Sequence, residues 1–127
     1  MLEADDARLL TEIGMLAAGR GDVQHADTIF NALRRLRPGR AYPLVGLAVA
    51  RLNAGQADEA VHLLENVALA DGPEQGVVRA WCGLALQLAG RRAESLKVLS
   101  EAAALPGDGG VLARQMLGQA DAVPNDA

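Results

Sequence analysis

Residues 40–55 read RAYPLVGLAVARLNAG, an apolar segment with a helix start at one end and a helix stop at the other. Pro43 suits the first turn of a helix, where a backbone N–H has no partner within the helix. Gly55 suits the position just past the last turn. Apolar residues occupy two faces at helical spacing, one containing Leu44 and the other Val49. A helix that is apolar all round must be covered on both sides, so the question is what covers the second side.

The composition favours one soluble all-α domain. Half of the 127 residues are apolar but only 2% are aromatic, which suits close helix packing better than a β sandwich. The net charge of −4 gives no electrostatic reason to expect nucleic-acid binding. The N-terminus lacks a secretory signal, and no apolar run approaches the roughly 18 residues of a membrane span. We expect a cytoplasmic protein without membrane insertion, with a domain over 1–122 and a frayed tail over 123–127.

Helical periodicity and turn residues predict six further helices around the opening segment. Their expected ranges are 5–19, 22–36, 57–70, 74–89, 92–105 and 111–120. In the first of these, apolar residues recur at helical spacing: Leu9, Leu10, Ile13, Leu16 and Ala17. Residues 71–73 are expected to form a turn, and the glycine-rich residues 107–110 a loop.

Tight turns recur at a regular interval. Gly21, Gly55 and Gly90 are 34 and 35 residues apart, and 34 is the period of the tetratricopeptide repeat. Small residues fall at matching places in each unit, such as Gly14 and Gly83. We therefore expect tetratricopeptide-like repeats at about 7–40, 41–75 and 76–109, capped by a helix at 111–120, in a right-handed superhelical α-solenoid. Two positions usually held by large apolar residues carry arginine instead, Arg51 and Arg79.

The repeat resemblance implies a concave groove lined by the first helix of each unit. Carried onto this chain, the partner-binding residues are Met15, Tyr42, Val45, Val49, Leu52, Val77, Ala80, Leu84 and Leu88. Such an apolar groove suits the apolar face of an amphipathic helix. Of the basic and amide residues that bind a peptide carboxylate in other repeat domains, only Arg8 and Asn53 are present here. The chain's own tail, or a second copy in a homodimer, are alternative occupants of the groove.

Short motifs narrow the resemblance. The segments LLTEI at 9–13, RLNAG at 51–55 and WCGL at 81–84 resemble the small tetratricopeptide chaperones of bacterial type III secretion that hold the needle subunit. The resemblance implies that the groove grips an amphipathic helix of the needle protein and prevents premature polymerisation. It also implies a small helical cochaperone at the N-terminal repeats. Arginines at 34, 35, 37 and 40 either meet an acidic partner or form a solvated helix end.

No arrangement of residues indicates catalysis. His25 and His62 have no metal-ligand spacing, and Cys82 has no histidine near it in sequence. We expect no catalytic residue, no metal and no cofactor. The alternative to a chaperone is a general tetratricopeptide scaffold for protein–protein interaction.

Overall fold

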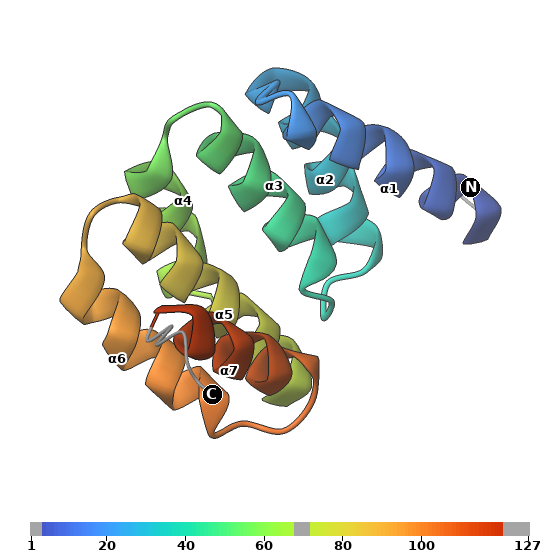
Figure 1. Ribbon diagram of the computed structural model, residues 1–127. Coiled ribbons are helices and arrows are strands. Elements are labelled where there is room, and N and C mark those ends of the chain that lie inside the picture. The colour runs from blue at the N-terminus through green and yellow to red at the C-terminus, as the bar shows by residue number, and fades with distance from the viewer. Residues whose placement is uncertain (1–3, 68–71, 121–127) are drawn as a thin grey trace.

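The computed structural model describes residues 4–67 and 72–120, and these residues form seven α-helices and no strand (Figure 1). The prediction of an all-α chain is confirmed. The expected tail at 123–127 lies outside the described residues. The helices are α1 Ala4–Gly19, α2 Val23–Leu36, α3 Tyr42–Asn53, α4 Ala57–Glu65, α5 Gly72–Leu88, α6 Arg92–Ala103 and α7 Asp108–Ala120.

The helices pack in two layers. In one layer α1, α3, α5 and α7 contact one another in that order. Each of α2, α4 and α6 packs against the two odd-numbered helices that flank it in the chain. Figure 1 shows the succession from α1, beside the N-terminus, to α7 at the opposite end. Within residues 4–67 and 72–120, the even-numbered helices make no contact with each other.

Glycines close the three tight turns between paired helices, as the sequence predicted. Gly21, Gly55 and Gly90 have φ angles of +70°, +78° and +80°. This left-handed backbone region is accessible to glycine at little cost, whereas a side chain would be strained there. The three turns therefore share the same left-handed backbone conformation, and they recur at the predicted interval.

The larger core cluster is built around Phe30 of α2, which is fully buried. Its ring lies against Gly14 of α1 and Gly46 of α3, which have no side chain. A Cβ atom placed on Gly46 would be 2.4 Å from the ring, and one on Gly14 would be 2.9 Å from it. Both distances are below the closest approach of ordinary carbon atoms. The two glycines therefore make room for one aromatic ring between three helices.

The same device recurs between α5 and α6. A Cβ atom on Gly83 would lie 2.4 Å from the Leu99 side chain, which is buried. Leu99 belongs to a second core cluster that contains Ala80 of α5 and Ala113 of α7. This cluster attaches α7 to the last helix pair.

Several helix boundaries differ from the predicted ones. α4 ends at Glu65, while 70 was expected, and residues 68–70 lie outside the described part of the chain. α6 ends two residues early, at Ala103. α5 begins at Gly72, so the predicted turn at 71–73 is wrong for its last two residues, and Pro73 lies in the first helical turn, where proline is tolerated.

The predicted loop at 107–110 is also wrong, because α7 begins at Asp108. Two glycines in its first turn suggested a loop, but one of them serves packing. A Cβ atom on Gly109 would lie 2.1 Å from the carbonyl carbon of Gly76 in α5. Glycine is therefore required at this point for the backbones of α5 and α7 to approach.

Candidate binding surface

The α3 helix, which contains the apolar opening segment, lies in the middle of the molecule. It contacts α1, α2, α4 and α5, and its residues from Pro43 to Ala48 are buried. Val49 and Leu52 are half-buried at its C-terminal half. Most of the second apolar side is thus covered by the chain itself, and only part of it remains for another molecule.

The nine residues predicted to line a groove all come from α1, α3 and α5, which form one layer. Seven of them reach the surface to some degree. Met15 is 43% exposed and Leu88 is 60% exposed. Five are half-buried: Tyr42, Val49, Leu52, Val77 and Leu84. That this set binds a partner stays a prediction.

The other two predicted groove residues are buried. Val45 of α3 is 8% exposed, and Ala80 of α5 has no exposed surface. Ala80 shares its cluster with Ala113 of α7, and Leu112 and Met116 pack around that cluster. The C-terminal helix therefore covers the face of α5 at Ala80, while Leu88, two turns further along α5, stays exposed.

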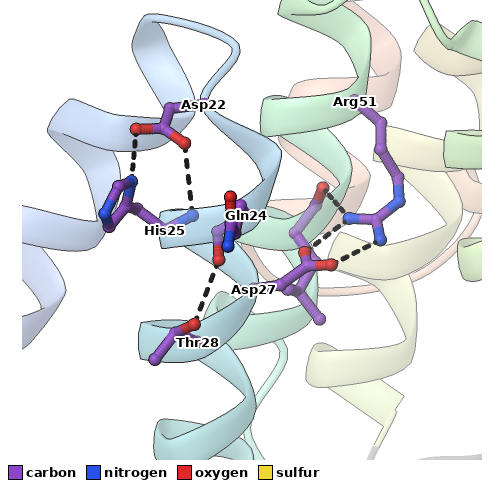
Figure 2. Close-up of polar contacts among 7 residues, drawn as sticks. Asp22, Gln24, His25, Asp27, Thr28 and Arg51 are labelled. Carbon is purple, nitrogen blue, oxygen red and sulfur yellow. Dashed lines mark hydrogen bonds and ion pairs between the residues drawn. The ribbon is translucent and has the colours of Figure 1, made fainter.

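Arg51, at a position where an apolar residue was expected, is held by an acidic residue of the neighbouring helix. Figure 2 shows its guanidinium facing Asp27 of α2, with Nη1 2.8 Å from Oδ1 and Nη2 2.9 Å from Oδ2. Nη1 also donates to the Leu47 carbonyl at 3.0 Å. The hydrogen bonds to Asp27 raise the pKa of Arg51. This two-point ion pair ties α2 to α3 and was not predicted, because residues 24 apart give no sequence signal of contact.

Polar side chains also join one helix pair to the next. The Asn53 amide donates to the Ala18 carbonyl at 3.0 Å, which links the ends of α3 and α1. The Glu74 carboxylate of α5 accepts from the backbone N–H of Ala41, at the start of α3, and from Arg40 Nε at 3.4 Å. These contacts fix the layer that carries the predicted groove residues.

The four arginines in the last turn of α2 and just after it divide into two groups. Arg40 is engaged with Glu74, and its guanidinium lies 5.7 Å from the centre of the Tyr42 ring, within cation–π range. Arg34, Arg35 and Arg37 are exposed. Arg40 therefore belongs to the joint between α3 and α5, and the predicted acidic partner would have to meet the other three.

The α1 helix departs most from expectation. Of the five residues at helical spacing, Ala17 is buried and Leu10 is half-buried against the core, but Leu9, Ile13 and Leu16 are 55%, 44% and 62% exposed. α1 packs through small residues instead, including Ala17 and Ala18, which are buried. A side chain at Gly14 would collide with the Phe30 ring, so the inner face of α1 consists mainly of small residues, with Leu10 as its larger aliphatic member. The run of small residues at helical spacing was the available signal for this orientation.

These outward residues line a shallow apolar hollow. It is formed by Leu9, Thr11, Glu12, Ile13, Met15 and Leu16, all from α1. Met15 belongs to the predicted partner-binding set, whereas Leu9, Ile13 and Leu16 do not. The hollow therefore lies mainly on a different face of α1 from the predicted groove.

His25 and the cysteine have structural surroundings. Asp22 caps α2 by accepting the His25 backbone N–H at 3.2 Å, and His25 Nδ1 lies 2.7 Å from the other carboxylate oxygen (Figure 2). The backbone hydrogen bond from His25 is the main cause that lowers the pKa of Asp22. Cys82 is buried, and burial raises the pKa of its thiol. A raised pKa disfavours the reactive thiolate.

Comparison with known proteins gives one result that covers nearly the whole chain. The family of bacterial type III secretion proteins described as HrpB1_HrpK matches residues 3–118. No curated protein and no solved structure is significantly similar. Within the described residues, no helix has the length and apolar character required to cross a membrane. The chain belongs to the HrpB1_HrpK family of bacterial type III secretion proteins.

Proposed function

We propose that this chain is a non-enzymatic chaperone that holds an amphipathic helix of a secreted type III subunit, with the needle protein as the intended client. Membership of a type III secretion family supports the setting. The observation that carries the proposal is the exposed or half-buried aliphatic set on the layer of α1, α3 and α5, from Met15 through Val49 to Leu88. Binding there would bury the client surface that otherwise polymerises, and it would take place in the bacterial cytoplasm, before export.

The proposal includes a tetratricopeptide-like solenoid. Three helix pairs with glycine turns at the repeat interval support it. So does the order of contacts, in which odd-numbered helices follow one another and even-numbered helices lie outside them. In such an arrangement the odd-numbered helices line the concave face. The right-handed superhelix is part of this proposal.

The chemistry of the surface favours a helical client with an apolar stripe. Val49, Leu52 and Leu84 are aliphatic, and none of the nine predicted partner-binding residues carries a charge. An amphipathic helix presents apolar residues at intervals of three and four, which match a row of side chains from parallel helices. Because Ala80 is covered by α7, we place the client over α1, α3 and the C-terminal half of α5.

The test uses the two most exposed residues of the predicted groove. A Met15→Glu/Leu88→Glu variant should bind a fluorescently labelled peptide of the needle subunit's C-terminal helix about 100-fold more weakly, as anisotropy would measure, because two charges would face an apolar surface. Far-UV circular dichroism should stay unchanged, since both side chains point to solvent. Leu36→Glu, at a residue that is 49% exposed on α2, is the matched control and should bind normally.

A second variant probes the middle of the surface. Val49→Glu/Leu84→Glu should also abolish capture of the co-expressed needle subunit. If both double variants bind the peptide as the unaltered chain does, the layer of odd-numbered helices is not the client site. If the unaltered chain captures no needle-type helix but retains other protein partners, the scaffold role replaces the chaperone role.

A further inference from the structure

One face of α1 carries a self-complementary row of side chains. Asp5, Leu9, Ile13, Leu16 and Arg20 follow one another at intervals of four, four, three and four residues, which stacks them on the same side of the helix. All five are exposed, and the three aliphatic residues are 55%, 44% and 62% exposed. Among the described residues α1 contacts only α2 and α3. The C-terminal half of the row borders Asp22, His25 and Ile29 at the start of α2, and the row is otherwise open.

The charges at the two ends of the row have opposite sign. Asp5 lies in the first turn of α1 and Arg20 directly follows its last residue. When two such helices run antiparallel, with a two-fold axis between Glu12 and Ile13, Asp5 of each copy meets Arg20 of the other. The same axis sets Leu9 against Leu16 twice and brings the two Ile13 side chains together at the centre. Antiparallel helix dipoles also attract.

From this pattern we propose that a second copy of the chain covers the row, α1 against α1, in an antiparallel two-fold dimer. A two-fold interface must be self-complementary, because each surface meets itself reversed. The row fulfils that condition in both charge and apolar character. A parallel pair would instead set Asp5 against Asp5 and Arg20 against Arg20, so the antiparallel arrangement is the one the charges select.

The axis also creates one unfavourable contact. Glu12 lies on the flank of the row, and a two-fold axis at this point places both Glu12 carboxylates on the same side, near the centre. Like charges at close range weaken association. Removal of the Glu12 charge should therefore strengthen the dimer. A substitution at a surface position outside the interface should not do so.

The first experiment measures the mass of the full chain by sedimentation equilibrium, from about 1 µM to about 200 µM. We expect a monomer–dimer equilibrium. Leu16→Glu should raise the dissociation constant at least about 50-fold, because a carboxylate would replace the most exposed aliphatic contact. Leu36→Glu, at a residue of α2 that is 49% exposed and lies outside the row, should leave it nearly unchanged. Equal far-UV circular dichroism of both variants would show that the fold is intact.

The second experiment tests the orientation. Asp5→Arg and Arg20→Asp should each raise the dissociation constant about 5-fold, since each creates two like-charge pairs. An equimolar mixture of the two variants should dimerise as the unaltered chain does, because all end pairs are then of opposite charge. Glu12→Gln should lower the dissociation constant about 3-fold.

Three outcomes would overturn the proposal. A monomer at every concentration excludes the dimer. A dimer that Leu16→Glu leaves unaffected but Leu88→Glu dissociates lies in the predicted groove instead. A dimer whose single charge variants do not weaken it uses α1 in another orientation. The client-binding test is separate, because it measures peptide affinity and not the mass of the chain in solution.

Discussion

The two ends of the helix stack differ in how far their apolar side chains are covered. At the C-terminal end, α7 covers α5 and α6, and its buried Ala113 closes a small apolar cluster. At the N-terminal end, α1 leaves Leu9 and Leu16 more than half exposed. A stack of helix pairs needs a polar cap at each end to stay soluble alone. Here the chain supplies one cap itself, and the other end keeps a surface that a second molecule can cover.

The C-terminal cap is polar outside and fastened at its edge. Arg114 and Gln115 of α7 are exposed, with Val111 as the one large aliphatic exposed residue of this helix within its described residues. Arg114 Nη1 donates to the Ala103 carbonyl at 2.8 Å. That carbonyl lies in the last turn of α6, where carbonyl groups have no hydrogen-bond donor within the helix. The side chain therefore completes α6 while α7 covers it.

The largest expected change in stability tests whether the N-terminal end of the helix stack has a well-packed core. Phe30→Ala should lower the free energy of unfolding by about 3–5 kcal/mol, because it empties the space between Gly14 and Gly46. Urea denaturation measures this. Leu16→Ala, outside the core, should change it by less than about 0.5 kcal/mol. If both variants behave alike, the exposed leucines reflect loose packing of the whole N-terminal end, and the comparison fails.

The next effect breaks the cap at the other end. Gly109→Val should cost about 1–3 kcal/mol, because its side chain would collide with the backbone of Gly76 and lift α7 from α5. Binding of a dye to the newly exposed apolar surface should rise together with the loss of stability. Gly118→Ala, where an added Cβ meets no atom within 4 Å, is the control and should be neutral or slightly stabilising. Equal stability of both variants would mean that α7 is not closely attached.

A smaller effect concerns the link between the N-terminal pair and the rest. Asp27→Ala should cost about 1–2 kcal/mol, because the Arg51 side chain, only 17% exposed, loses both carboxylate contacts. The cost is limited because Asp27 itself is 31% exposed and water can reach the site. Arg51→Met, which restores the apolar residue usual at this position, should recover part of the loss in the double variant. No recovery would show that Asp27 acts through another contact.

The smallest effect is a dependence of stability on pH at the start of α2. The pKa of Asp22 is lowered in the folded chain, chiefly by the hydrogen bond from the His25 backbone N–H. A lowered folded pKa means that the contribution is complete above the unfolded value, about 4, and is lost as pH falls through the folded value. The melting temperature of the unaltered chain should therefore fall more below pH 4 than that of Asp22→Ala. Parallel curves for the two proteins would contradict the cap.

The sequence predicted the parts of the fold that depend on local chemistry. The glycines at 21, 55 and 90 and the proline at 43 each act within a few residues, and all have the predicted role. The start of α7 was missed because Gly109 serves contact with α5, far away in sequence. The orientation of α1 was predicted only in part, because Leu10, Gly14 and Ala17 pack inward while Leu9, Ile13 and Leu16 do not. Its periodicity shows which residues share a face, but the side that packs is chosen by the Phe30 ring of another helix.

The candidate surface was predicted less completely than the fold. Periodicity and repeat register placed the nine groove residues on one layer, but they could not show that Ala80 would lie beneath α7. The Arg51–Asp27 pair and the Glu74 contact with Ala41 depend on the approach of separate helices. A charged residue at a usually apolar repeat position was the one available sign that such a partner existed.

The Phe30 ring has a consequence for any two-copy assembly. Because the ring fills the space left by Gly14 and Gly46, α1 cannot slide along α3 without a collision. Two chains joined through α1 would therefore hold their client surfaces at a fixed distance and angle, as two sites on one rigid frame. A client with two suitable helices, or two clients that associate with each other, would then bind with an avidity set by that geometry.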